Sequence, residues 1–272
     1  MIRLSVRARA DDAEAVLGEL LELAPSGVEQ VDGEGFVEYA LYGAPGELPT
    51  LPSGEARIAG HAVFVRGEPV PDDWGERWKR FHSPVLVGGR LWVRPSWEEP
   101  AIRPGVHEIV IDPGQAFGTG AHPTTRMCLE LMLGLEARGS FVDLGCGSGV
   151  LAIAAAKLGF EPVAALDSDR AAVAATERNA RDNAVALDDV ARFDLRRESA
   201  PPADVVVANL QRRLLLQVAS LLQFAPRALI VSGLLEQEAG EVAAAFGPDL
   251  GEHGRLTDRG WTALVLTRQS RA

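Results

Sequence analysis

The sequence predicts an α/β protein with a doubly wound, mostly parallel sheet, preceded by a small N-terminal α+β domain. From about residue 139, short apolar segments alternate with helical patterns. Continuous apolar strands joined by helices are typical of a parallel sheet covered on both faces. Before residue 67, strand patterns surround a single helical pattern instead. The two halves therefore belong to different architectures.

The first 66 residues read as the α+β domain. Ile2–Ala8 alternates like a strand, Asp11 and Asp12 are typical of a helix start, and an apolar stripe continues to Leu23. Two further strands are expected at 35–41 and 62–65, which gives a unit of the split βαβ kind. Three prolines mark 67–84 as a helical linker, and 85–272 form the main domain.

The main domain begins with two short strand patterns, at 91–94 and 107–111, followed by a helical pattern at 126–135. Five apolar strands are then expected, at 141–144, 163–166, 205–208, 229–231 and 263–266. Helical patterns at 150–158, 169–183, 211–223 and 236–245 lie between them. These elements account for the parallel sheet.

Composition limits the classes of function. A net charge of −11 and a pI near 5.0 argue against nucleic acid bound through a broad basic face, and favour a small molecule or a basic partner. No apolar run suits a membrane helix, and the N-terminus lacks a signal-peptide core, so we expect a cytoplasmic protein with no membrane partner. Five histidines and two cysteines show no ligand spacing, so no metal is expected.

A glycine-rich turn follows the first apolar strand of the parallel sheet. The sequence from 143 to 149 reads Asp-Leu-Gly-Cys-Gly-Ser-Gly, and a helical pattern follows it. The spacing G-x-G-x-G is one residue tighter than a dinucleotide fingerprint. This spacing and Asp143 favour S-adenosylmethionine, and Gly145 and Gly147 allow its close approach. Asp167, at the end of the next strand, is suited to accept hydrogen bonds from ribose hydroxyls.

The strand at 205–208 ends at Asn209 and Leu210. In methyltransferases that modify amines, this position resembles an Asn- or Asp-Pro-Pro-aromatic motif, of which this sequence keeps the Asn. That resemblance implies an amine substrate such as lysine, which has a pKa of about 10.4 and must lose a proton before it attacks a methyl group. The Asn209 side-chain carbonyl and the Leu210 backbone carbonyl are suited to accept its N–H groups and to orient its lone pair. We therefore predict Asn209 and Leu210 as the catalytic residues, with Asn209 also touching the cofactor.

A loop at 112–125 precedes the parallel sheet and is rich in glycine and threonine. Such a segment packs poorly but suits a ligand-covering loop. Phe117 is a candidate to cover the cofactor, while Thr124 and Thr125, at the start of the following helical pattern, are candidates to hold its amino-acid end.

These motifs together resemble the PrmA family of class I S-adenosylmethionine-dependent methyltransferases. The matching segments are 112–125, with Ala-Phe-Gly-Thr-Gly-Ala-His-Pro-Thr-Thr, then 143–149, and Asn-Leu at 209–210. The resemblance implies a seven-stranded Rossmann-like sheet and N-methylation of lysine side chains and the α-amino group of ribosomal protein L-eleven (L11). It also implies that Thr125, Gly145, Asp167 and Asn209 bind the cofactor, and that the N-terminal domain grips the substrate protein.

The charge of the N-terminal domain agrees with that implication. Residues 1–70 contain twelve acidic and five basic residues, a net charge of −7. Ribosomal proteins are usually basic, so an acidic surface would steer them toward the enzyme. We expect a monomer that needs no direct nucleic-acid contact.

Two alternatives remain open at this stage. An Asn-based site also serves nucleic-acid exocyclic amines, although the acidic charge and the absence of an aromatic residue after Asn209 count against that substrate. A methyltransferase scaffold can also act as a cofactor-binding module without catalysis. The intact glycine motif beside Asn209 favours an enzyme.

Overall fold

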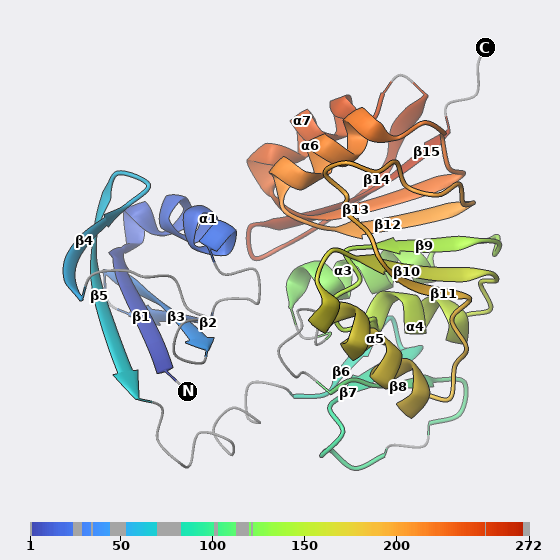
Figure 1. The fold of residues 1–272 in the computed structure, drawn as a ribbon, viewed down its shortest axis with the longest axis horizontal. Coiled ribbons are helices and arrows are strands. Elements are labelled where there is room, and N and C mark those ends of the chain that lie inside the picture. Colours follow the sequence, from blue (N-terminus) through green and yellow to red (C-terminus); the bar gives the residue numbers. More distant parts are fainter. Residues whose placement is uncertain are drawn as a thin grey trace. The chain divides into compact units, whose positions relative to one another are not determined.

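The computed structural model describes residues 2–23, 29–33, 35–43, 53–69, 83–100, 103–112, 120, 122–247 and 249–268. They divide into two compact units, one before residue 82 and one from residue 82 onward (Figure 1). Strand β5 runs to Pro69, so the first residues of the predicted linker continue a strand. The rest of that linker, up to residue 82, lies outside the described residues.

The N-terminal unit is a five-stranded antiparallel sheet with one helix on one face. Its elements are β1 (Ile2–Arg9), η1 (Ala10–Asp12), α1 (Ala13–Leu23), β2 (Glu29–Gly33), β3 (Phe36–Gly43), β4 (Gly54–Ile58) and β5 (His61–Pro69). The strand order is β2-β3-β1-β5-β4. Because β3 pairs antiparallel with both neighbours, β1 and β2 run parallel with β3 between them. A split βαβ arrangement was predicted, but its second parallel strand is β2, which had not been predicted.

Helix α1 seals the core of this unit. Val16 and Leu20 have no exposed surface and pack against Val6 and Val65. The hydroxyl of buried Tyr39 donates a hydrogen bond of 2.8 Å to the Ala13 carbonyl, which fixes the helix start on the sheet. The sequence did not reveal β2 and β4, because both are edge strands, and in β4 only Ile58 is fully buried.

The second unit is built on a seven-stranded sheet, in the order β11-β10-β9-β12-β13-β15-β14. Its strands are β9 (Phe141–Leu144), β10 (Val163–Asp167), β11 (Asp189–Arg192), β12 (Val205–Asn209), β13 (Ala228–Leu235), β14 (Leu250–Asp258) and β15 (Trp261–Arg268). The first five in the chain are parallel, while β15 is antiparallel to both of its neighbours. The doubly wound, mostly parallel prediction is confirmed, although β11 and β14 had not been predicted.

Helices cover both faces of this sheet (Figure 1). Helices α3 (Pro123–Leu133), α4 (Val150–Lys157) and α5 (Arg170–Asp182) lie on one face, and α6 (Arg212–Leu221) and α7 (Ala239–Ala245), the latter preceded by η2 (Glu236–Glu238), lie on the other. Helix α3 begins three residues before the predicted start at Arg126, because Pro123 occupies its first turn and His122 caps it.

A three-stranded sheet packs behind the helices of the first face. It consists of β6 (Val85–Val87), β7 (Leu91–Arg94) and β8 (His107–Val110), and it shares one apolar core with α3 and α4. Leu91 and Ile109 are fully buried in that core. None of the helices in the described part of the chain is sufficiently long and apolar to cross a bilayer.

Candidate active site

The predicted site residues gather at the carboxyl ends of β9, β10 and β12. The strand order reverses between β9 and β12, because β10 and β11 extend the sheet on one side and β13 extends it on the other. Ligands of doubly wound sheets bind in the crevice at such a reversal. The glycine turn, Asp167 and Asn209 each follow or end one of these three strands.

The glycine turn needs its glycines for conformation and for space. Gly145, Gly147 and Gly149 all have positive φ, of 78°, 53° and 82°, which side chains other than glycine adopt at a cost. A Cβ on Gly145 would lie 2.3 Å from Cδ2 of Leu210. The turn therefore lies directly against the end of β12, so the cofactor turn and the predicted catalytic residues adjoin each other.

Asp167 is fixed by two backbone groups. Its Oδ2 accepts from the Gly147 N–H at 3.0 Å, and its Oδ1 accepts from the Asp169 N–H at 2.9 Å. A carboxylate oxygen accepts about two hydrogen bonds, so each retains capacity for one ribose hydroxyl. Asp169 in turn caps α5 by accepting from the Ala171 N–H.

Asp143 is buried behind the turn. It is 1% exposed, and its Oδ2 accepts from the Ala152 N–H in α4 at 3.2 Å. Its Oδ1 has no hydrogen-bond partner among the described residues. Burial, reinforced by the charge of Asp167, raises the pKa of Asp143 to about 7. An unsatisfied buried carboxylate oxygen suits a cationic ligand such as S-adenosylmethionine, which carries an ammonium and a sulfonium.

Asn209 and Leu210 are held from two sides. The Asn209 Nδ2 donates to Thr125 Oγ1 at 3.3 Å, so its carbonyl oxygen, which accepts no bond from any described residue, is left for a ligand. The Leu210 N–H donates to the Ser232 carbonyl at 2.9 Å. Behind Leu210, a Cβ on Gly233 would lie 2.4 Å from the Leu210 carbonyl oxygen. Because Gly233 has no side chain, the Leu210 carbonyl can occupy this position without a steric clash.

The first turn of α3 brings two more predicted residues to this place. Thr124 and Thr125 have no exposed surface. His122 caps the helix by accepting from the Thr124 N–H, and its Nδ1 lies 2.7 Å from Thr124 Oγ1. Burial lowers the pKa of His122 to about 4, so the ring is neutral at pH 7. Phe117 lies outside the described residues.

Sequence reasoning missed the residues that hold the site from behind. Gly233 and Ser232 support Leu210, and Thr176 and Asn179 of α5 bond to the glycine turn. Gly233 could have been found from the sequence, because a glycine inside an apolar strand often marks a close approach of another backbone segment. Thr176 and Asn179 could have been found because they are polar residues three apart, and so lie on one face of α5. The described residues contain no cluster of side chains able to hold a metal ion.

Comparison with known proteins agrees with this geometry. A family model described as ribosomal protein L11 methyltransferase (PrmA) matches residues 59–269. A ribosomal protein L11 methyltransferase from Azotobacter vinelandii is 42% identical over 205 residues, covering 70% of this chain and 69% of that protein. One from Cupriavidus pinatubonensis is 37% identical over 292 residues, covering 95% of this chain and 96% of that protein.

A solved structure extends the similarity to the fold. The ribosomal protein L11 methylase of Lactobacillus delbrueckii subsp. bulgaricus superimposes with a TM-score of 0.61 at 25% identity, covering 70% of this chain and all of that one. The sequence match extends over most of the chain, and the site geometry suits a cationic nucleoside cofactor. The chain therefore belongs to the ribosomal protein L11 methyltransferase (PrmA) family, and its cofactor is S-adenosylmethionine.

Proposed function

We propose that this methyltransferase modifies lysine side-chain and α-amino groups of ribosomal protein L11. The observation that carries the proposal is the pair of carbonyls at the end of β12, where Asn209 is oriented by Thr125 and Leu210 is supported by Gly233. Two fixed acceptors suit a neutral primary amine, which offers two N–H groups and one lone pair. The names of the relatives support L11 over a nucleic-acid amine as the acceptor.

The proposed chemistry is positioning rather than strong base catalysis. S-adenosylmethionine supplies a methyl group activated by its sulfonium. Asn209 and the Leu210 carbonyl hold the amine with its lone pair aimed along the line of displacement, which is worth several kcal/mol in well-oriented reactions. The same acceptors favour the deprotonated amine over a hydrated ammonium ion. Asp167 and the glycine turn hold the cofactor, and Asp143 stabilises its positive charge.

The test is methyl transfer by an Asn209→Ala variant at saturating cofactor. We expect turnover on purified L11 to fall by roughly 10²-fold, comparable to the removal of one oxyanion-hole donor. Gln211→Ala is the matched control, since Gln211 begins α6 without a side-chain capping bond. Wild-type turnover by Asn209→Ala would overturn the assignment. Methyl transfer to ribosomal RNA but not to L11 would overturn the substrate.

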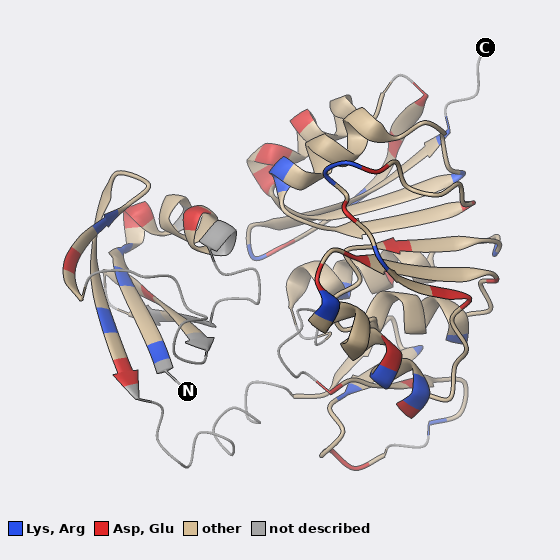
Figure 2. Ribbon diagram, in the orientation of Figure 1, with Lys and Arg blue, Asp and Glu red and all other residues tan. Residues whose placement is uncertain are grey.

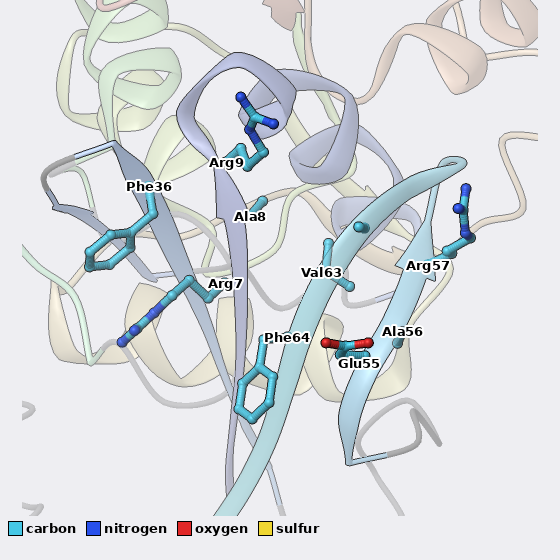
Figure 3. Close-up of a pocket in the computed structure, with 10 residues that line it drawn as sticks. Arg7, Ala8, Arg9, Phe36, Glu55, Ala56, Arg57, Val63 and Phe64 are labelled. Carbon is cyan, nitrogen blue, oxygen red and sulfur yellow. The ribbon is translucent and has the colours of Figure 1, made fainter.

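We also propose that the N-terminal unit binds the substrate, through its acidic side. All five arginines of residues 1–70 lie on the open face of the sheet, which α1 does not cover. They are Arg3, Arg7, Arg9, Arg57 and Arg66. Figure 3 shows a hollow on this face, with Arg7 beside Phe36 and with Phe64 exposed. Among the side chains that the structure describes, this face carries five arginines and three acidic residues, Glu38, Glu55 and Glu68, so it is basic overall.

Three further acidic residues of this unit have described side chains, Asp11, Asp12 and Glu19. Two of them, the exposed Asp11 and Glu19, lie on η1 and α1 (Figure 2). A basic protein would be attracted to the helix side of the unit and repelled by the arginines of the open face. We therefore assign substrate docking to the side of the unit that carries α1.

A further inference from the structure

Three polar side chains on one face of α5 are almost fully buried. Thr176 is 0% exposed, Asn179 is 2% exposed, and Asn183, the C-cap of the helix, is 7% exposed. Their spacing of three and four residues places them on one face of the helix. Buried polar groups remain stable only where they are hydrogen-bonded, so the partners of these three show what this face does.

Thr176 and Asn179 bind the glycine turn from behind. The Thr176 hydroxyl donates to the Gly147 carbonyl at 3.1 Å, and Asn179 Nδ2 donates to the Ser148 carbonyl at 2.8 Å. These two carbonyls are consecutive in the turn. Asp167 holds the Gly147 N–H, and the Gly149 N–H donates to the Cys146 carbonyl at 2.7 Å. The Cys146–Gly147 and Ser148–Gly149 peptide groups are therefore held at both ends, and the peptide group between them is held at its carbonyl.

Asn179 also binds a second segment of the chain. Its Oδ1 accepts from the Asp112 N–H at 3.1 Å, so one amide group joins the glycine turn to the residue just past β8. Asp112 opens the 112–125 segment, which contains three of the predicted cofactor-binding residues, at 117, 124 and 125. The separation in sequence between Asp112 and Ser148 is large, and this side chain holds both at hydrogen-bond distance.

Asn183 also binds backbone groups through its side-chain amide, but none of these groups belongs to the glycine turn. Its Oδ1 accepts from the Val110 N–H at 2.8 Å, and its Nδ2 donates to the carbonyls of Val110 and Asn179, at 2.6 and 2.8 Å. It therefore anchors the end of β8 to α5. Asn183 provides an internal comparison, because it is a buried asparagine that binds the backbone at the end of β8 but does not touch the glycine turn.

We propose that Asn179 is a positioning residue for the cofactor, because its one amide holds the glycine turn and the start of the 112–125 segment in a fixed relation. Thr176 assists by fixing the preceding carbonyl of the turn. A site that is already ordered loses less conformational entropy when ligand binds. The inference rests on the placement of the cofactor at the glycine turn, and it is independent of which amine is methylated.

The experiment compares Asn179→Ala with Asn183→Ala in the full-length protein. Cofactor binding is measured by calorimetry with S-adenosylmethionine and with S-adenosylhomocysteine, and stability is measured by thermal unfolding. Both variants should unfold at lower temperature, because each loses buried hydrogen bonds. Only Asn179→Ala should bind both ligands weakly, by roughly 10-fold or more, as for a lost buried hydrogen-bond partner. Asn183→Ala should stay within about 2-fold of wild type, since it leaves the turn intact.

Turnover provides a second measurement that a loss of stability alone would not change selectively. Asn179→Ala should raise the KM for the cofactor while leaving kcat at saturating cofactor within about 3-fold, because Asn209 and Leu210 are untouched. Equal weakening of cofactor binding in both variants, or unchanged binding in Asn179→Ala, would overturn the proposal.

If Asn179→Ala does not fold, Thr176→Val decides the question. Valine has the shape of threonine and removes only the hydroxyl that fixes the Gly147 carbonyl. Weaker cofactor binding by Thr176→Val, with Asn183→Ala normal, supports control of the turn by α5. Unchanged binding by Thr176→Val overturns it. Because ligand binding is measured without any acceptor, these outcomes are separate from failure of L11 methylation.

Discussion

The Asp143 carboxyl shows how one buried group couples the cofactor turn to pH. Its pKa in the folded protein is about 7, against an ordinary value of 3.8, and desolvation is the main cause. Between these two values the folded protein keeps a proton that the unfolded chain has released. The free energy of unfolding of the cofactor-free protein should therefore decrease as pH rises through this window.

Asp143→Asn should remove that contribution to the pH dependence, measured as the change in urea-unfolding midpoint between pH 5 and pH 8. Asp204→Asn is the contrasting control. Two hydrogen bonds from Ser140 lower the pKa of Asp204 below its ordinary value of 3.8, so its contribution changes only below that pH, and Asp204→Asn should leave the change between pH 5 and pH 8 as in the wild type. A wild-type pH profile in Asp143→Asn would show that the carboxyl is not buried as described.

Gly233 gives the second prediction at the residue scale. Its φ is 86°, and a Cβ there would lie 2.4 Å from the Leu210 carbonyl oxygen. Gly233→Ala must therefore displace that carbonyl, and we expect turnover to fall by about 10-fold or more if the carbonyl helps orient the amine. Cofactor binding should change much less. Gly240→Ala is the control, because a Cβ there meets nothing within 4 Å. Normal turnover by Gly233→Ala would exclude a role for the Leu210 carbonyl.

At the scale of elements, the start of α3 is set by a histidine rather than by the usual Ser or Asp. Because burial lowers the pKa of His122 from 6.5 to about 4, the ring caps the helix in its neutral form. The unfolded chain binds a proton below pH 6.5 that the folded chain does not, so His122 lowers stability as pH falls from about 6.5 to about 4.

The His122→Asn variant should keep the helix cap while removing the group that titrates. Asparagine is a good N-cap, so stability at pH 7 should stay within about 1 kcal/mol of wild type, and the loss contributed by His122 at low pH should disappear. His122→Ala should be roughly 1 kcal/mol less stable than His122→Asn at both pH values, because both variants lack the titrating ring and only the alanine lacks a cap. Unfolding at pH 5 and pH 7 measures both effects. If His122→Asn retained the whole acid sensitivity of the wild type, a group other than His122 would be responsible.

At the scale of the whole molecule, the proposed docking of a basic protein on the helix side of the N-terminal unit can be tested by reversing charges. Reversing two acids of the helix side, in Asp11→Lys with Glu19→Lys, should raise the KM for L11 and weaken its dependence on salt. The matched reversal on the open face, Arg57→Glu with Arg66→Glu, should leave that KM unchanged or lower it. Steady-state methylation at two ionic strengths measures both. The opposite ranking would move substrate docking to the open face.

The sequence predicted most of the fold because its signals are local. Apolar runs and helical periodicity identified the five central strands of the mostly parallel sheet and the helices between them. The edge strands β2, β4, β11 and β14 were not predicted, because an edge strand usually buries too few side chains to show a clear apolar pattern. The start of α3 was misplaced by three residues, since a histidine cap at 122 is not an ordinary helix-start signal.

By itself, the sequence determined the cofactor class, because glycine spacing and the acids at strand ends are constraints that short segments impose on their own backbone. The tertiary structure decided which residues support that motif. It placed Asp143 behind the turn, brought Gly233 against Leu210, and joined Asp112 to Ser148 through Asn179. These contacts join residues far apart in the chain. A single sequence does not show such neighbours, because only packing of the sheet and its helices brings them within hydrogen-bond distance.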